Sequence, residues 1–384
     1  MPVLGAAVNI CERPHPFEWK PDSQYLPNGT ELAKYLAEQS AYYPDIFTQR
    51  RDEHGQLVYE PVYDLVRVSQ YVEVAKGALP LHLALHEVFA QRYHPSIVHR
   101  FLARLAQVVP PERPLLTLTT NYDDALELAF RDAGVAYDVI TYVTDYPERK
   151  KGHFTHSWWK PGEPAESEPS PIKRPKTSTE ILRDRPAVVK IHGAVRRDRD
   201  VAADNYVITE DDYIDFMVHQ NPANLLPVSV AERLPDSHFL FLGYALRDWN
   251  LRVLLRRIWQ KQSRRPKSWS VRLGADQTEV QWWDNQDVAT LLHDLAEYVV
   301  ALRWACLERL LSSFAHDEPE ERRATLEQTR PAALFERLQR DEDRNALFER
   351  LPQDHLRAFV ESAAKETSPP ETLLDEIRRI IHGL

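Results

Sequence analysis

The stretch PLLTLTT at residues 114–120, followed by NYDD at residues 121–124, decides the fold of this chain. Residues 114–120 combine aliphatic and β-branched side chains over a length that is typical of a buried strand. The polar residues that follow open a helical pattern, which runs to about Gly134. A buried strand that passes directly into a helix is the repeating unit of α/β proteins with parallel sheets.

Further stretches repeat this pattern along the chain. The strand candidates are residues 135–143, 187–191 (AVVKI), 238–242 (HFLFL), 269–273 and 287–292. Several of them end at once in polar residues, and Asp248 is the predicted cap of a helix over residues 249–261. Strands that alternate with helices favour a parallel sheet. We therefore predict an α/β fold with a Rossmann-like parallel sheet, an inserted helical subdomain and a helical C-terminal module.

The segments outside these strands suggest a domain organisation. Apolar residues at i, i+3, i+4 spacing over residues 30–40 and 80–109 predict a helical insertion at about residues 30–110. Residues 147–186 are rich in proline and poor in aliphatic side chains, so they are predicted to form an exposed loop. Residues 318–384 are charged and have helical periodicity. We assign residues 1–317 to the main domain and residues 318–384 to the C-terminal module.

Composition excludes several classes of function. The net charge of −10 argues against direct, sequence-independent binding of nucleic acid. No apolar run approaches the roughly 20 residues of a membrane-spanning helix, and the N-terminus lacks the features of a signal peptide, so we expect a cytoplasmic protein without a membrane partner. The only 2 cysteines, Cys11 and Cys306, cannot form a four-cysteine zinc site, and we expect no zinc.

Polar and small residues follow the predicted strands at the edge where ligands of open α/β sheets bind. They are Thr119, Thr120, Asn121 and Asp123 after one strand, His192 and Gly193 after a second, and Gly243, Tyr244 and Asp248 after a third. Near the N-terminus, the short strand Val3-Leu4 enters the small-residue turn Gly5-Ala6-Ala7-Val8-Asn9. Such a turn lets backbone N–H groups approach a pyrophosphate. Each feature alone is more often structural, but their shared edge predicts a site.

Together these motifs resemble those of the sirtuin family. TTNYD at residues 119–123 resembles the sirtuin Thr-x-Asn-x-Asp motif, and KIHG at residues 190–193 resembles the strand end that carries the catalytic histidine. FLFLGYALRD at residues 239–248 resembles the late Gly-x-Ser-Leu segment, in the form found in bacterial sirtuin-like proteins. YVITEDDY at residues 206–213 also resembles a segment of that prokaryotic group. The motifs occur in family order and cover roughly residues 1–310.

The chain departs from the family pattern at two places, and the first of them points to the zinc-free prokaryotic branch. Sirtuin deacetylases carry a four-cysteine zinc module after the His-Gly motif, whereas residues 194–237 contain no cysteine. The family turn is usually Gly-Ala-Gly, whereas this chain has Ala7. The zinc-free relatives are known chiefly as NAD-cleaving effectors of antiphage defence. The resemblance therefore implies an enzyme, an NAD⁺ hydrolase, which takes NAD as its substrate and releases nicotinamide and ADP-ribose.

The resemblance also implies roles for individual residues. By analogy, Asn121 and His192 are catalytic: the amide holds the attacking water or the ribose hydroxyls, and the imidazole is a general base or a ribose hydroxyl partner. Asp123 has two equally good interpretations: its carboxylate holds the loop or the ribose, or it caps the following helix. The residues expected to bind NAD are Gly5, Ala6, Ala7, Asn9, Thr120, Asp123, Gly243 and Tyr244. The turn is expected at the diphosphate, with Gly243 and Tyr244 near the adenosine half.

Two other functions stay open. One is an NAD-dependent protein deacylase with a different substrate cleft, and the other is a non-catalytic module that binds NAD or an ADP-ribose-like nucleotide. The absence of the zinc cysteines argues against the deacylase, and the presence of both Asn121 and His192 argues against the non-catalytic module. From the family we also expect a homo-oligomer and a separately encoded ATPase-like or helicase-like defence partner.

Overall fold

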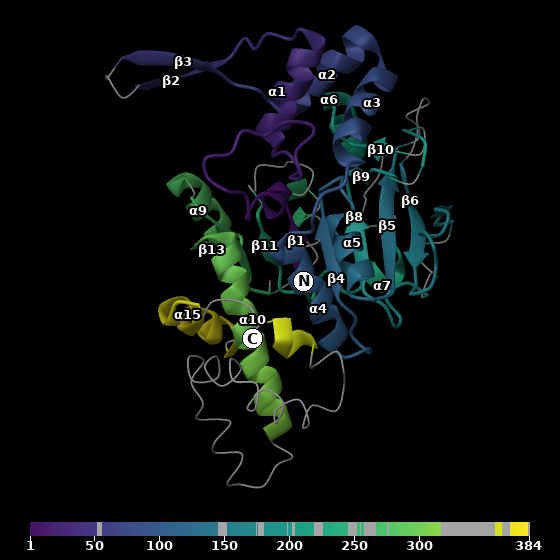
Figure 1. Ribbon diagram of the computed structural model, residues 1–384, viewed down its shortest axis with the longest axis vertical. Coiled ribbons are helices and arrows are strands. Elements are labelled where there is room, and N and C mark those ends of the chain that lie inside the picture. The colour runs from purple at the N-terminus through teal and green to yellow at the C-terminus, as the bar shows by residue number, and fades with distance from the viewer. Residues whose placement is uncertain are drawn as a thin grey trace.

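A computed structural model describes residues 1–51, 56–144, 152–173, 175, 180–197, 199–201, 204–218, 226–244, 252–253, 255–256, 266–274, 276–315, 358–362 and 369–382. In this part of the chain a nine-stranded sheet has the order β13-β12-β11-β1-β4-β8-β5-β6-β7 (Figure 1). The strands are β1 (Pro2–Leu4), β4 (Leu116–Thr119), β5 (Tyr137–Val143), β6 (His153–Trp159), β7 (Ser170–Pro171), β8 (Ala187–Lys190), β11 (Leu240–Leu242), β12 (Ser268–Arg272) and β13 (Val288–Leu292).

Neighbouring strands from β13 to β5 are parallel, and only β6 and β7 are antiparallel. The predicted α/β fold with a mostly parallel sheet is therefore confirmed. The chain places β4, β8 and β5 on one side of β1 and later β11, β12 and β13 on the other. The order thus reverses at β1, and ligands of open α/β sheets bind in the crevice beyond such a reversal.

Helices cover both faces of the sheet. One face packs against α4 (Ile97–Val108), α5 (Ala125–Asp132), α10 (Leu295–Ala315) and α15 (Glu371–His382), and the other against α6 (Glu210–Val218), α7 (Val228–Ala231) and α9 (Gln277–Asp284). Val188 and Val189 are neighbours in β8, yet they belong to different clusters: Val188 to the cluster that contains Phe130 of α5, and Val189 to the one that contains Phe216 of α6. The alternation follows from the period-2 geometry of a strand.

A third apolar cluster lies beyond the carboxyl ends of the strands, where Figure 1 shows the helices of the insertion. These helices are α1 (Gly29–Ser40), α2 (Leu65–Lys76) and α3 (Ala78–Phe89). Asn28 caps α1 by accepting a hydrogen bond from the backbone of Glu31 at 2.9 Å, and the Glu31 carboxylate accepts one in return from the backbone of Asn28 at 2.7 Å. This reciprocal pair is the capping box that fixes where a helix begins.

Two strands of the insertion were not expected from the sequence. β2 (Phe47–Arg51) and β3 (Leu57–Pro61) form an antiparallel hairpin that projects from the molecule as an arm (Figure 1). The exposed and half-buried positions alternate along β3, so its pattern has no fully buried face. Without a buried face, this short stretch lacks the apolar pattern that would predict a strand from the sequence.

Part of the predicted loop at 147–186 is a strand instead. β6 pairs antiparallel with the whole of β5, and Phe154 and Trp159 are buried. The proline-rich composition around it concealed this strand. Two short strands, β9 (Gly193–Ala194) and β10 (Asn205–Tyr206), form a separate antiparallel pair.

The described C-terminal segments pack on the body of the protein. Phe359, in a helical turn at residues 358–362, and Leu374 and Ile377 of α15 are buried in the apolar cluster that also contains Trp304 of α10 and Val188 of the sheet. The helices predicted over residues 318–357 and most of the helix predicted at 249–261 lie outside the described residues. None of the described helices is long and apolar enough to cross a membrane.

Candidate active site

The turn after β1 is bound to the end of β11. The turn continues into a short 3₁₀ helix, η1 (Ala6–Asn9). The backbone N–H of Gly5 donates to the carbonyl of Leu242 at 3.0 Å, and that of Ala7 donates to the carbonyl of Gly243 at 3.1 Å. The N–H groups of Gly5 and Ala7 in the predicted phosphate-binding turn therefore already donate hydrogen bonds within the protein. Among Gly5, Ala6 and Ala7, only Ala6 is exposed.

Asn121 is bound to the same turn from the other side. Its side-chain amide donates to the carbonyl oxygen of Gly5 at 3.2 Å. Its backbone N–H donates to the hydroxyl of Thr119 at 3.0 Å, and that hydroxyl donates to the carbonyl of Leu4 at 3.1 Å. The backbone N–H of Thr120 lies 3.4 Å from the same carbonyl. The loop after β4 and the turn after β1 therefore form one hydrogen-bonded unit.

Asp123 and Asn9 also meet in the structure. The side-chain amide nitrogen of Asn9 donates to Oδ2 of Asp123 at 2.7 Å, and Oδ1 of Asp123 accepts from the backbone of Ala125 at 3.1 Å. Asp123 thus caps the start of α5 and holds Asn9 at once, so the two interpretations of this residue do not exclude each other. Oδ1 of Asn9 is buried and has no hydrogen-bond partner among the described residues. A buried polar atom of this kind needs a partner, which a ligand would supply.

His192 lies just past β8 and is 2% exposed. Its ring is 5.5 Å from the ring of Tyr213 and 6.4 Å from that of Phe216, both on α6. Gly193 follows with φ of +86°, and a Cβ at this position would lie 2.0 Å from the carbonyl oxygen of Asn205. Because only glycine fits there, the sharp turn that places His192 depends on Gly193.

The register of the sheet places the predicted site residues at the same height along their neighbouring strands. Leu4 pairs with both Thr119 and Leu242, and Thr119 pairs with Lys190. The Gly5 turn, Asn121, His192 and Gly243 each follow one of these paired residues, so they meet along the edge at the β1 reversal. Tyr244 is buried beside Phe241 behind this edge, and Asp248 lies outside the described residues.

Part of the chain is similar to a known protein family. The model of the SIR2-like domain family matches residues 116–291, from β4 to β13. The resemblance to sirtuin-like proteins is thereby confirmed. β1 precedes the matched residues in the sequence, but in the sheet it lies between two of the matched strands, β4 and β11.

The chain is also similar to a curated protein. The chain is 26% identical over 204 residues to a protein named NAD(+) hydrolase ThsA from Cytobacillus dafuensis. The alignment covers 53% of this chain and 32% of that relative. The chain thus spans about a third of the length of the relative that it matches.

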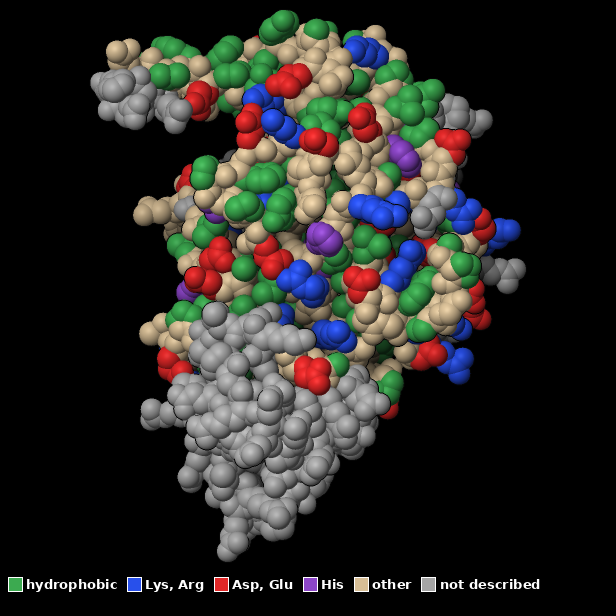
Figure 2. Space-filling view, viewed as in Figure 1, with side chains coloured by type: hydrophobic (Ala, Val, Ile, Leu, Met, Phe, Trp, Pro, Cys, Tyr) green, Lys and Arg blue, Asp and Glu red, His purple; other side chains and the backbone are tan. Residues whose placement is uncertain are grey.

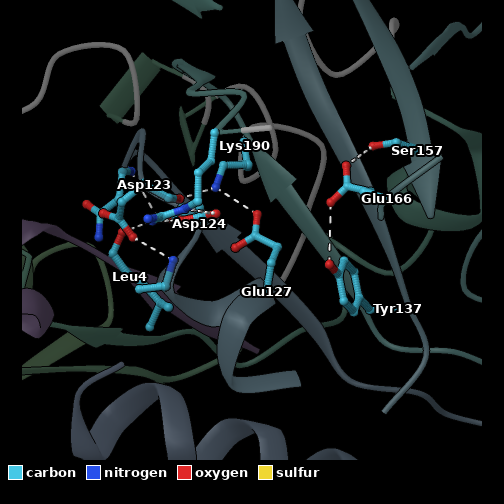
Figure 3. A network of polar contacts seen from close by, with 12 residues as sticks. Leu4, Asp123, Asp124, Glu127, Tyr137, Ser157, Glu166 and Lys190 are labelled. Carbon is cyan, nitrogen blue, oxygen red and sulfur yellow. Dashed lines mark hydrogen bonds and ion pairs between the residues drawn. The ribbon is translucent and has the colours of Figure 1, made fainter. Parts of the chain in front are cut away.

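The region that matches the SIR2-like family also contains a buried polar network that sequence patterns did not reveal (Figure 3). Lys190 is 2% exposed, and its ammonium group donates to the backbone carbonyl of Asp123 and to the carboxylate of Glu127, the latter at 2.8 Å. Burial alone would lower the pKa of Lys190, but the carboxylates of Glu127 and Asp123 outweigh it and raise that pKa. The sequence signal for this network is the charged residue within the apolar strand AVVKI, because a buried lysine needs a partner.

Asp124 is the centre of a second part of this network. Its carboxylate binds the guanidinium of Arg197 and accepts a hydrogen bond from the hydroxyl of Tyr93. Burial acts to raise the pKa of Asp124, but the hydrogen bonds from Arg197 outweigh it and hold that pKa below its usual range. Asp124 is therefore a charged residue at the base of the loop that carries Asn121.

Among the residues that the structure describes, no group of three or more His, Cys, Asp or Glu side chains could hold a metal ion. Cys11 and Cys306 are free thiols. Burial raises the pKa of Cys11 to about 12 and that of Cys306 to about 11, so both thiols stay protonated and unreactive near neutral pH.

Proposed function

We propose that the protein is an NAD⁺ hydrolase that cleaves NAD to nicotinamide and ADP-ribose. The observation that carries this proposal is the bond from the amide of Asn121 to the carbonyl of Gly5. It links the candidate catalytic amide to the turn at the point where the sheet order reverses. A SIR2-like domain at residues 116–291 and a similar protein named as an NAD(+) hydrolase support the same conclusion.

The reaction breaks the bond between C1′ of the ribose and the pyridinium nitrogen. The electron pair of that bond stays with the nitrogen, so nicotinamide leaves as a neutral molecule and the sugar becomes oxocarbenium-like. Water attacks C1′ and releases a proton. Asn121 orients the water or the ribose hydroxyls, because an amide both donates and accepts hydrogen bonds. His192 accepts the proton or binds a ribose hydroxyl.

The remaining candidate residues bind NAD in this proposal. Gly5, Ala6 and Ala7 face the diphosphate, together with Thr120, and Gly243 and Tyr244 lie on the adenosine side. The orphaned Oδ1 of Asn9 accepts a hydrogen bond from the nucleotide. Asp123 fixes Asn9 in this position through the 2.7 Å bond.

The test is to incubate the purified protein with NAD and to measure nicotinamide and ADP-ribose by chromatography. Asn121→Ala and His192→Ala should each reduce the cleavage rate by a factor of about 10²–10⁴, which is typical of a lost acid–base or orienting group. His153→Ala on β6, which lies near the far end of the sheet from β1, is the control and should keep the wild-type rate. A folded Asn121→Ala protein with wild-type activity would refute this assignment of the site.

We further propose that the protein acts in the cytoplasm as a triggered effector of antiphage defence, with a separately encoded ATPase-like or helicase-like protein as its partner. The similarity to NAD(+) hydrolase ThsA and the sirtuin-like motifs support this role. Cells that carry the gene should lose NAD and stop phage spread after infection, and cells with Asn121→Ala should not. Equal phage titres in the two strains would refute the defence role.

We also propose that the protein forms a homo-oligomer. The arm formed by β2 and β3 supports this proposal, because Phe47, Leu57 and Tyr59 on it are all more than half exposed. Figure 2 shows apolar side chains along this projecting arm. An isolated two-stranded hairpin is marginally stable in water, so contact with a second copy would stabilise it. Light scattering should give a multiple of the 44.6 kDa chain mass, and a monomer mass at every concentration would refute the proposal.

A further inference from the structure

We propose that Arg197 is a positioning residue for the candidate catalytic loop, residues 121–124. It holds this loop against both the helical insertion and the segment that carries His192. The proposal rests on the proposed function for its kinetic test, but not for its structural test.

Arg197 binds Asp124 through two parallel hydrogen bonds. Its Nε lies 3.0 Å from Oδ2 of Asp124, and its second terminal nitrogen lies 2.7 Å from Oδ1. Such a fork fixes the carboxylate in orientation as well as in distance. The side chains are 17% and 19% exposed, so solvent screens this pair much less than a surface pair.

The same guanidinium reaches the end of α3. Its remaining terminal nitrogen donates to the backbone carbonyls of Ala90, at 3.1 Å, and Gln91. Its central carbon lies 4.6 Å from the centre of the Tyr93 ring, within the range of a cation–π contact. The Tyr93 hydroxyl donates to Asp124 and accepts from the backbone N–H of Asp124 at 3.0 Å. One arginine thus joins the insertion to the catalytic loop.

The segment that carries Arg197 also carries His192. Between them, the backbone N–H of Val195 donates to the carbonyl of Tyr122 at 2.9 Å. Lys190, at the start of the segment, binds the carbonyl of Asp123. Successive residues of the loop are therefore bound by this one segment, and Arg197 forms the outermost of these bonds.

The position of Asn121 depends on these bonds. Asp124 ends the loop and provides the carbonyl that accepts from Leu128 in the first turn of α5 at 2.9 Å. Without Arg197, the hydroxyl of Tyr93 would be the only partner left to the carboxylate of Asp124 among the described residues. A small shift of a reacting group costs a large factor in rate, and a displacement of about 1 Å can cost about a hundredfold.

Substitution of Arg197 should leave the protein folded. Arg197 lines a cleft of about 50 Å³ together with Glu127, Lys190 and Arg196. Water can enter such a polar space and solvate the groups that the substitution leaves behind. Loss of the guanidinium therefore loosens the loop without opening an apolar cavity in the core.

The kinetic test compares Arg197→Met and Arg197→Lys with a matched control, Arg199→Met. Arg199 lies two residues away and binds the exposed Glu168 at the surface. We expect Arg197→Met to lower kcat about tenfold to a hundredfold with less than a threefold change in KM. Arg197→Lys keeps the charge but not the fork, so it should restore only part of the rate. Arg199→Met should match the wild type.

A double substitution distinguishes the loss of loop positioning from a general loss of folded protein. Arg197→Met combined with Asp124→Asn should lose no more rate than the worse single variant, because both remove the same bond. Additive losses would overturn the proposal. So would an Arg197→Met protein with wild-type kcat, or one whose loss of kcat is fully explained by its unfolded fraction.

Hydrogen exchange gives a test that does not depend on catalysis. In Arg197→Met the backbone amides of Asn121, Asp124 and Ala125 should exchange at least tenfold faster than in the wild type, while the amides of β4 keep their protection. Unchanged exchange in the loop would overturn the proposal. Faster exchange in the loop of a protein that cleaves no NAD would support positioning by Arg197 and refute the proposed function instead.

Discussion

Gly5 and Gly243 face each other across the ends of β1 and β11 so closely that a Cβ on Gly5 would lie 2.5 Å from the carbonyl oxygen of Gly243. The same Cβ would lie 2.7 Å from the Cα of Tyr244. Both neighbours are backbone atoms, which cannot turn aside as a flexible side chain can. The strand ends can therefore approach only because residue 5 has no side chain.

Gly5→Ala should destabilise the protein and disrupt the turn. We expect a loss of about 2 kcal/mol or more in the free energy of unfolding, measured by urea denaturation, because the backbone must shift to relieve the clash. Gly29→Ala is the matched control, since a Cβ on Gly29 meets no atom within 4 Å and Gly29 begins a helix. The control should be neutral or slightly stabilising. Equal stability of the two variants would contradict the close approach.

His99 should make stability depend on pH. Burial, aided by the positive charges of Lys190 and Arg100, lowers the pKa of His99 from 6.5 to about 4, although the charge of Asp123 acts in the opposite direction. Its Nδ1 accepts a hydrogen bond from the backbone N–H of Ser96 at 3.1 Å, which also favours the neutral ring. Between about pH 6.5 and pH 4 the unfolded chain binds a proton at this site and the folded chain does not.

The sign of this effect follows from linkage: stability decreases as the pH is lowered through this window. The shift corresponds to about 3 kcal/mol at the lower end of the window. His99→Gln should show a smaller loss of unfolding free energy between pH 7 and pH 4 than the wild type. His94→Gln, which changes an exposed histidine, should follow the wild type. If both variants follow the wild type, His99 does not stay neutral in the folded protein.

The C-terminal helix should contribute to the stability of the whole protein. Leu374 of α15 is fully buried in the cluster that contains Trp304 of α10. Leu374→Ala should therefore lower the free energy of unfolding by about 2–5 kcal/mol. Thr372→Ala, at an exposed position of the same helix, should have little effect. A small effect of Leu374→Ala would show that α15 does not pack on the body in solution.

The sequence could predict the sheet because its strands are apolar runs with polar ends. The predicted strand at 187–191 is β8 at Ala187–Lys190, and the one at 287–292 is β13 at Val288–Leu292. The meeting of Asn121 with the Gly5 turn could also be anticipated, because parallel strands end at one edge. The hairpin of β2 and β3 could not, because neither strand has a continuous apolar face.

Long-range polar partners could not be predicted in the same way. Arg197 and Asp124 are 73 residues apart, and the position of Asp124 at the start of a helix does not reveal which residue binds it. Lys190 is different, because a lysine within AVVKI has to be either an edge residue or a buried partner. The strand pattern predicts its burial, but only the fold reveals that its partners are Glu127 and the Asp123 carbonyl.

Ala7→Gly should bind NAD at least as tightly as the present sequence. The amide of Ala7 donates to Gly243, and a glycine would keep this bond while removing the methyl group from the expected path of the diphosphate. The cost in backbone entropy is about 1 kcal/mol or less. Calorimetric titration in the Asn121→Ala background measures the affinity without consuming NAD, and thermal unfolding of both proteins separates affinity from stability. Clearly weaker binding by a stable Gly variant would mean that the turn does not hold the diphosphate, and that the nucleotide lies elsewhere along the edge formed by β4, β8 and β11.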